Sequence, residues 1–184
     1  MKKTVVVLAE GFEEIEALTP IDVLRRAGLD VTVAGVGGTL ITGAHKVPVK
    51  CDVEISTIEN NHFDCIVLPG GMPGAVNLRN SKNVGKLITS IYNAGDLVCA
   101  ICASPAVVLG PLGVLDDKVA ACYPCMEGCA PNVTFVGDTP VLQCRNVITS
   151  AGPGTAGKFA FKIAEALIGK DISEKLRHDM IYIS

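Results

Sequence analysis

The 184-residue chain contains no tryptophan, three tyrosines, five phenylalanines and only three histidines. With so few aromatic residues, the core must be built mainly from Val, Ile, Leu and Ala. No run of about 18 apolar residues is present, so the sequence predicts no membrane-spanning helix. A net charge of −3 lacks the basic excess that is typical of nucleic-acid binding. What remains is a packed globular protein.

The amino-terminal segment Met1–Val7 resembles a signal peptide in its lysines and apolar run. Glu10, Glu13 and Glu14 interrupt that run early, and no cleavage site follows. We therefore expect a cytoplasmic protein whose eight cysteines are mostly reduced thiols. The length and apolar content fit a single domain over residues 1–184.

Short apolar runs alternate with helix-like segments along the chain. Strands are expected at Thr4–Ala9, Leu29–Val36, Leu40–Thr42, Val47–Cys51, Asp64–Leu68 and Leu97–Ile101. Helices are expected at Glu13–Ala27, Ser81–Ala94, from Ser104 onward, Gly157–Leu167 and Ser173–His178, with mostly strand and turn over Lys118–Ser150. Pro20 predicts a kink or break in the first helix. The alternation predicts an α/β sandwich with a mostly parallel central sheet.

The most informative segment is Leu97–Pro105, where an apolar strand ends at a cysteine. Small residues surround Cys102, and Ser104-Pro105 is a typical helix start. This pattern predicts a sharp strand-to-helix turn that presents the thiol at the carboxyl end of the strand. Backbone N–H groups and the helix dipole there should lower the pKa of the thiol. Cys102 is therefore the leading candidate nucleophile.

An oxyanion site for such a nucleophile needs backbone N–H donors close to the sulfur. The natural donors are Gly70, Gly71 and Ala103, because glycines let the backbone approach closely. A plain turn that ends the preceding strand is the simpler explanation of the two glycines.

Activation of the thiol would ordinarily come from a histidine, but none adjoins Cys102. The three histidines fit surface positions, and His45, in a turn, is the one that could reach the site. Glu13, Glu14 and Glu16 are the alternative partners, although a charged helix start explains most of them. A buried, protonated glutamate could donate a hydrogen bond to the thiolate.

The other cysteines suggest two competing sites. Cys99 and Cys102 have redox-motif spacing, but Cys99 belongs to the strand, so a redox pair is not favoured. Cys122, Cys125 and Cys129 could bind zinc or copper, but a structural zinc site needs four ligands and no fourth is evident. Incidental thiols explain them better. Phosphate-binding glycine motifs are also absent, so we predict neither a metal nor a cofactor.

Five segments in order and spacing resemble one family over essentially the whole chain. They are Leu8–Glu16, Asp22–Gly28, Val67–Gly71, Ala100–Ala103 and Gly152–Thr155. The chain resembles the DJ-1/PfpI superfamily, and within it the parkinsonism-associated deglycase branch and its bacterial relatives. The resemblance implies a flavodoxin-like three-layer sandwich and a homodimer.

The resemblance also implies roles for particular residues. Cys102 would be an oxidation-sensitive nucleophile hydrogen-bonded to Glu16, with the N–H groups of Gly71 and Ala103 as the oxyanion site. The helix that carries Asp22 and Arg26 would lie near the dimer contact and the site. Candidates for lining the site are His45, Tyr123, Asp22, Arg26 and Pro153.

Three positions depart from the family pattern. Ala103 follows the nucleophile where the protease-like branch has histidine, which argues against a Cys-His hydrolytic triad. Tyr123 stands where the eukaryotic deglycases place a histidine before a proline. His45 stands where close relatives have the arginine that binds an oxidised sulfur.

These patterns give three functional hypotheses. The first is a cysteine-dependent, cofactor-independent glyoxalase or deglycase acting on α-oxoaldehydes such as methylglyoxal, or on their early glycation adducts. The second is a redox sensor or redox-gated chaperone, in which Cys102 oxidises to a sulfinate that a protonated carboxyl stabilises. The third and least favoured is a cysteine peptidase. The expected partners are a small aldehyde or glycated substrate and a second copy of the chain.

Overall fold

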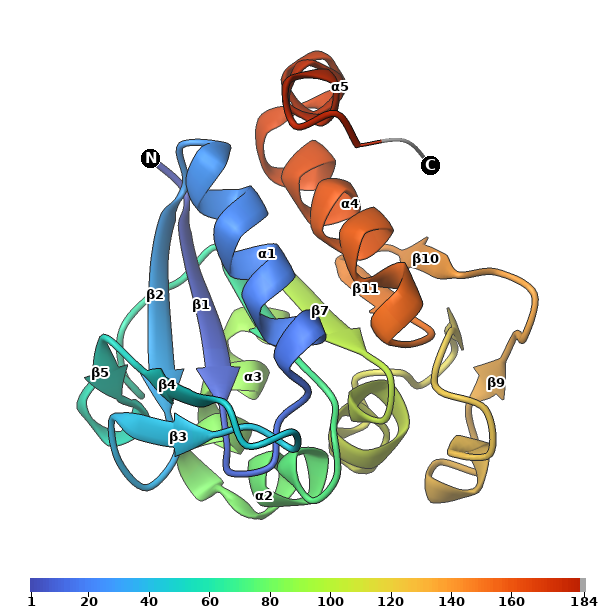
Figure 1. Ribbon diagram of the computed structural model, residues 1–184. Helices are drawn as coiled ribbons and strands as arrows, with labels where there is room; N and C mark the ends of the chain where they lie inside the picture. The colour runs from blue at the N-terminus through green and yellow to red at the C-terminus, as the bar shows by residue number, and fades with distance from the viewer. Residues whose placement is uncertain (183–184) are drawn as a thin grey trace.

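The computed structural model describes residues 1–182, and its centre is a seven-stranded sheet (Figure 1). In spatial order the strands are β10 (Val141–Cys144), β11 (Val147–Ser150), β7 (Leu97–Ile101), β6 (Cys65–Leu68), β1 (Lys3–Leu8), β2 (Asp30–Gly35) and β5 (Val53–Glu54). Neighbouring strands are parallel except β10, which pairs with β11 antiparallel. This is the expected flavodoxin-like α/β fold with a mostly parallel sheet. Residues 183 and 184 of the predicted single domain lie outside the described residues.

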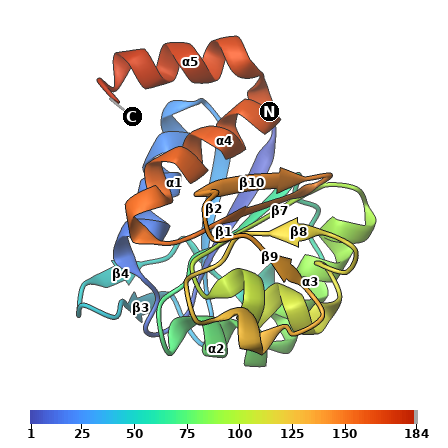
Figure 2. The same cartoon turned by 90° about the vertical axis from the view of Figure 1, so that its right-hand side faces the viewer.

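Helices cover both faces of the sheet (Figures 1 and 2). On one face lie α1 (Glu14–Arg26) and α4 (Ala156–Ile168), which pack together, and α5 (Lys170–Asp179) packs on α4. On the other face lie α2 (Gly74–Asn80) and α3 (Lys82–Asn93). Among the described residues, no helix combines the length and the apolar content that crossing a membrane requires.

Small elements decorate the loops. A hairpin of β3 (Leu40–Thr42) and β4 (Pro48–Lys50) lies beside the start of α1 (Figure 1), and β8 (Val119–Ala120) pairs with β9 (Thr134–Phe135). One-turn helices occur at Ile55–Thr57, Pro105–Leu109, Gly110–Leu112, Glu127–Cys129 and Pro153–Thr155.

The central strands are apolar because both of their faces are covered. Every residue of β6 and β7 is buried, as is β1 after its first residue. Val, Ile, Leu and Ala dominate the core, as predicted, and Phe12, Phe159 and Phe161 are its largest buried side chains.

Two local predictions need correction, and one helix was not predicted. Helix α1 is not broken at Pro20, because the face formed by Ala17, Ile21 and Leu24 is anchored in the core and outweighs the lost hydrogen bond. The helix after Cys102 is a single π-turn over Pro105–Leu109 rather than a regular α-helix. Helix α2 was not anticipated, because a segment of seven residues carries too little periodicity to be recognised.

Candidate active site

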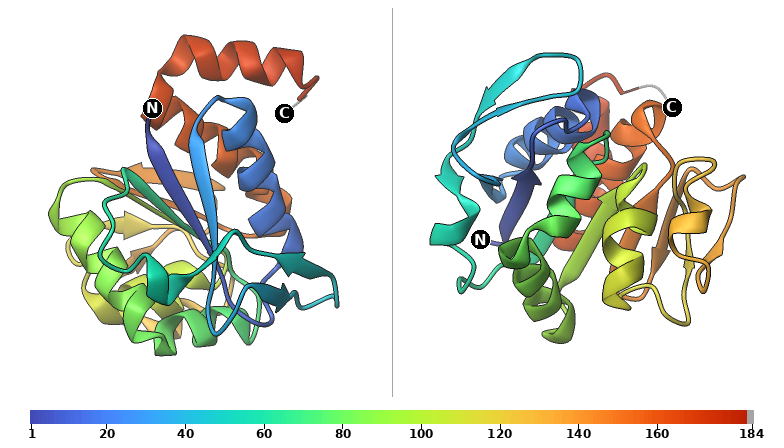
Figure 3. Two further views of the ribbon diagram at one scale, coloured as in Figure 1. Left: turned by 90° about the vertical axis from the view of Figure 1, so that its left-hand side faces the viewer. Right: turned by 90° about the horizontal axis from the view of Figure 1, so that it is seen from below.

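Three strand ends meet at the carboxyl edge of the sheet, which Figure 3 (right) shows from below. The segment after β1 leads into Glu16, the segment after β6 carries Gly70 and Gly71, and β7 leads directly into Cys102. Since β1, β6 and β7 are parallel neighbours, their carboxyl ends lie side by side. Ligand sites in open α/β sheets form at this edge.

Cys102 has the strained backbone expected of a nucleophile at a strand-to-helix turn. Its φ angle is 65°, in the left-handed region that side chains other than glycine rarely adopt. Two neighbouring segments hold it there. The Cys102 N–H donates to the Ser150 carbonyl at 2.9 Å, and the Tyr123 N–H donates to the Cys102 carbonyl at 2.7 Å. The side chain is only 9% exposed.

Glycine is required beside the thiol. A Cβ atom on Gly70 would lie 2.7 Å from the Cys102 Cβ and 2.8 Å from Glu16 Oε2. Gly71 has a φ angle of 87°, and a Cβ there would lie 2.4 Å from the Glu13 nitrogen. Both positions therefore exclude any side chain, which is a stronger demand than a strand-ending turn makes.

Glu16 is fully buried in this site. Its Oε2 accepts a hydrogen bond from the Gly70 N–H at 2.8 Å, and its Oε1 has no hydrogen-bond partner of good geometry among the described residues. The Gly70 N–H is thus engaged by the carboxyl and is not free for an oxyanion, contrary to the sequence-based assignment. The N–H groups of Gly71 and Ala103 remain, and both interact with the Cys102 sulfur.

Burial sets the proton affinities of the pair. It raises the pKa of Glu16 from the usual 4.5 to about 7, although the hydrogen bond from the Gly70 N–H and the interaction with the Cys102 thiol lower it. Burial and the Glu16 charge raise the pKa of the Cys102 thiol to about 12, and the N–H groups of Gly71 and Ala103 offset this only in part. The prediction of a lowered thiol pKa is therefore wrong. Over the range between those values the pair holds one proton, so the thiol lies beside a base able to accept it.

Two carboxylates at the start of α1, the N-cap residue Glu13 and the first helical residue Glu14, lie close to His45 of the β3–β4 hairpin. Glu14 Oε1 accepts from the His45 backbone N–H at 2.7 Å, and Glu14 Oε2 lies 2.9 Å from His45 Nδ1. Glu13 Oε2 lies 3.5 Å from the same ring nitrogen. Burial opposes ionisation of Glu14, but the hydrogen bonds from His45 and Val47 lower its pKa overall. The hydrogen bond to Glu14 and the two negative charges raise the pKa of His45.

The remaining candidates divide into two groups. Tyr123 lies at this edge, because its N–H bonds Cys102 and its ring approaches Gly152, where a Cβ would lie 3.1 Å away. Pro153 directly follows Gly152. Asp22 and Arg26 form an exposed ion pair of 2.8 Å with each other, about 9 and 15 Å along α1 from Glu16. The structure does not bring that pair to Cys102 of the same chain.

The other thiols lie apart from this arrangement. Cys99 is buried in β7 with its sulfur 3.8 Å from that of Cys65, and burial holds its pKa well above the usual value. Cys122 is buried, whereas Cys125 and Cys129 are exposed. Within the described residues, no three of these thiols come close enough to share a metal ion.

Two other groups have metal-ligand chemistry. Glu13, Glu14 and His45 form one, and His62, Asp64 and Asp96 form the other. In the second group both Asp64 oxygens are already engaged at 2.7 Å, by the Lys2 ammonium and the Lys3 N–H. The lysine charge at this position disfavours a cation.

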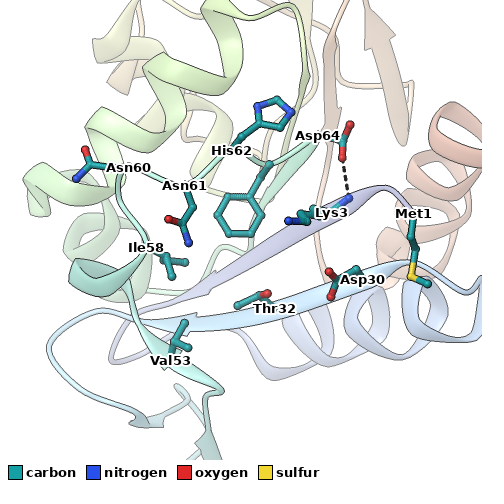
Figure 4. A pocket seen from close by; sticks show the side chains of 11 residues that line it. Met1, Lys3, Asp30, Thr32, Val53, Ile58, Asn60, Asn61, His62 and Asp64 are labelled. Carbon is teal, nitrogen blue, oxygen red and sulfur yellow. Dashed lines mark hydrogen bonds between the residues drawn. The ribbon is translucent and has the colours of Figure 1, made fainter.

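A pocket of about 740 Å³ adjoins that second group at the opposite, amino end of the strands (Figure 4). Its walls combine apolar side chains with polar ones that point to solvent, among them Lys3, Asp30, Asn60 and His62. No thiol lines it, and no strained residue of the described chain belongs to it. This pocket and the candidate nucleophile therefore lie at different ends of the sheet.

Comparisons with known proteins agree with this architecture. Residues 2–166 match the DJ-1/PfpI family. Protein dj-1beta of Drosophila melanogaster is 43% identical over 92% of this chain and 91% of its own length. Glutathione-independent glyoxalase DJR-1.2 of Caenorhabditis elegans is 36% identical over 91% of this chain and 89% of its own.

A solved structure extends the agreement to three dimensions. Oxidized Toxoplasma gondii DJ-1 is similar to this chain with a TM-score of 0.94 and 38% sequence identity, and all of each chain is covered. The sequence comparisons and the structural comparison thus agree over the central sheet and the helices that cover it. The chain belongs to the DJ-1/PfpI family.

Proposed function

We propose that this protein is a cysteine-dependent, cofactor-independent glyoxalase or deglycase that acts on α-oxoaldehydes such as methylglyoxal, or on their early adducts. The observation that carries the proposal is the pairing of a strained, buried thiol with a buried carboxyl whose second oxygen has no hydrogen-bond partner of good geometry among residues 1–182. The glyoxalase named among the relatives, at 36% identity, supports it.

The chemistry follows from this geometry. The Cys102 sulfur attacks the aldehyde carbon, an S–C bond forms, and the thiol proton passes to Glu16, whose pKa is raised to about 7. The N–H groups of Gly71 and Ala103, beside the sulfur, stabilise the negative charge that develops on the aldehyde oxygen. Protonation of that oxygen gives a hemithioacetal.

Glu16 can then complete the reaction by moving a second proton. After passing the thiol proton on to the aldehyde oxygen, the Glu16 carboxylate removes the proton from the former aldehyde carbon and returns it to the adjacent carbon. The hydroxyl proton moves to the former ketone oxygen, and the hemithioacetal becomes a lactoyl thioester. Water cleaves the S–C bond of the thioester, releasing lactate and restoring the thiol. The balance is methylglyoxal plus water giving lactate, so no external oxidant or reductant is consumed.

The test is methylglyoxal consumption with lactate detection, in the presence of a chelator. We expect Cys102→Ala to lose turnover completely, and Glu16→Gln to lose it by about 10²–10⁴-fold. Cys144→Ala, which removes a thiol from β10, is the matched control and should keep full activity. Full turnover by Cys102→Ala would disprove the proposal.

The second candidate function is redox sensing, and the protonation of Glu16 favours it. With the pKa raised to about 7, a substantial fraction of Glu16 is protonated at neutral pH and can donate its proton to an oxidised sulfur. A related protein has been observed in an oxidized state. Intact-mass analysis after mild peroxide should show selective oxidation of Cys102, and a lack of selectivity would count against this role.

We further propose that the chain forms a homodimer through α1. Ile15 and Leu18, one turn apart on this helix, are 54% and 39% exposed although they are apolar. Light scattering should report twice the mass of the chain, and Ile15→Lys should shift the population toward monomer. A monomeric wild type would contradict the proposal.

A further inference from the structure

Glu13, Glu14 and His45, here called the mouth triad, form a charged group that the chemistry above does not use. His45 Nδ1 lies 2.9 Å from Glu14 Oε2 and 3.5 Å from Glu13 Oε2. The two carboxylate side chains are only 13% and 10% exposed, whereas the imidazole is 71% exposed. The carboxylates are therefore largely buried, and the imidazole that can balance their charge faces solvent.

Glu13 connects this triad to the reacting atoms. Its N–H donates to the Gly70 carbonyl at 3.0 Å, and its nitrogen lies against Gly71 so closely that a Cβ there would be 2.4 Å away. The N–H of Gly71 in turn interacts with the Cys102 sulfur. Burial raises the pKa of Glu16, and the nearby negative charge of Glu13 raises it further.

The balance of charge within the triad is negative. Two carboxylates outweigh a single imidazole even when the imidazole is protonated, and the Cys102–Glu16 pair adds a further negative charge once its first proton has left. Lys46, next to His45, is exposed, and within the described residues no lysine or arginine forms an ion pair with Glu13 or Glu14. Charges that are largely buried are screened much less by salt than exposed ones.

We infer that Glu13 is a specificity-determining residue that makes the site favour uncharged α-oxoaldehydes over those that carry a carboxylate. The inference rests on the proposed function for its substrate class, but the selection by charge acts on any electrophile that approaches Cys102. An anionic electrophile must enter the negative field of Glu13, while a neutral one of the same shape does not.

The first experiment measures charge selection without turnover. Iodoacetamide and iodoacetate have nearly the same size and differ by one charge. Each forms an S–C bond at Cys102, releases iodide and frees the thiol proton, and peptide mass spectrometry gives the rate at this cysteine alone. We expect the amide-to-acid rate ratio at Cys102 to exceed that of free cysteine by about 10-fold, and Glu13→Gln to bring it within about 3-fold of free cysteine.

Glu13→Asp is the matched variant, because it keeps the charge and should keep most of the selection. A merely structural role for Glu13 would change both alkylation rates together and leave their ratio unchanged. The same ratio in the wild type and Glu13→Gln would therefore overturn the inference.

The second experiment uses substrates, methylglyoxal as the neutral one and 4,5-dioxovalerate as the anionic one. We expect the wild type to prefer methylglyoxal in kcat/KM, and Glu13→Gln to reduce that preference about 10-fold with a smaller change for methylglyoxal itself. Charge-selective alkylation without consumption of either aldehyde would refute the proposed function and the substrate preference but leave selection at Cys102 established. Turnover of both aldehydes with no effect of Glu13→Gln would refute the specificity role alone.

Discussion

Each end of the central sheet carries a carboxyl group, Glu16 at one and Asp64 at the other, but the two groups differ in burial and hydrogen bonding. At the carboxyl end, Glu16 is fully buried and one of its oxygens has no well-placed partner in the described part of the chain, and Cys102 has a left-handed backbone. At the amino end, Asp64 is hydrogen-bonded through both oxygens, to Lys2 and Lys3, beside a pocket of about 740 Å³. The carboxyl group at one end is tightly packed and incompletely hydrogen-bonded, and the carboxylate at the other end is fully hydrogen-bonded beside open space.

The difference shows which property indicates function in this fold. A buried polar atom without a partner costs free energy, and Glu16 carries such an atom beside a candidate nucleophile. A strained backbone is likewise kept only where its surroundings impose it. Asp64, with both oxygens occupied, has little capacity left for a ligand despite the space beside it.

The largest effect should come from removing one carboxylate at each end. Glu16→Gln should lower kcat/KM for methylglyoxal by about 10²–10⁴-fold, because the proton acceptor of the thiol is lost. Asp64→Asn should change it by less than about twofold, since the Asp64 carboxylate is hydrogen-bonded to Lys2 and Lys3 at the end of the sheet opposite Cys102. A comparable loss of kcat/KM in both variants would show that the two ends of the sheet do not differ in their contribution to turnover.

The same two carboxylates should respond to pH with opposite signs. The folded protein raises the pKa of Glu16 from 4.5 to about 7, so this group stabilises the fold below pH 4.5 and loses that contribution as pH rises through about 7. The shift corresponds to about 3 kcal/mol. Urea unfolding between pH 5 and 8 measures this effect. The free energy of unfolding should fall with rising pH more steeply for the wild type than for Glu16→Gln.

Asp64 supplies the opposite case for that experiment. The hydrogen bond from Lys2 holds the pKa of Asp64 below its usual 3.8, so its contribution is present above that pH and is lost on acidification. Asp64→Asn should thus flatten the acid side of the stability profile. A Glu16→Gln profile parallel to the wild type from pH 5 to 8 would contradict the raised pKa.

A third comparison sets two glycines against each other. Gly70→Ala should destabilise the protein by about 1–3 kcal/mol and reduce activity, because the new methyl group overlaps Cys102 and Glu16. Gly137→Ala, where nothing lies within 4 Å of the added Cβ, should be close to neutral. Thermal unfolding measures the loss of stability in both variants. An equal loss in the two would show that the packing around Gly70 can accommodate a methyl group.

The smallest effect is expected for His62 at the amino end. Its side chain is 68% exposed and lies 3.9 Å from Asp96. His62→Ala should change the free energy of unfolding by less than about 0.5 kcal/mol and leave turnover unchanged. A loss of turnover here would be direct evidence that the amino-end pocket takes part in the reaction.

Much of this arrangement follows from sequence patterns that have direct physical causes. Continuous apolar runs predict the buried parallel strands, and the residues after Ile101 predict the turn at Cys102, whose φ of 65° fits that expectation. The carboxyl group that pairs with Cys102 is harder to predict from the sequence. Three glutamates lie close together in sequence, and the resemblance to the family points to Glu16, the one that the structure buries completely.

Other features depend on distances that sequence does not contain. The Gly70 N–H bonds Glu16 rather than an oxyanion, and this depends on the placement of two loops. The thiol pKa is raised because burial and a neighbouring charge outweigh two N–H groups, a balance that spacing alone cannot reveal. Asp22 and Arg26 share a helix with Glu16, but their distance along it follows only from the helical rise.

The two hydrogen bonds that hold Cys102 have a consequence for dynamics. One comes from the segment that follows β8, through Tyr123, and the other goes to the last residue of β11, Ser150. Relaxing the strained residue would require both attachments to open, so fraying of a single loop cannot release it. Reagents too bulky to enter the folded site should therefore label Cys102 only as fast as the sheet opens cooperatively. The labelling rate of this thiol then measures the opening rate of the sheet.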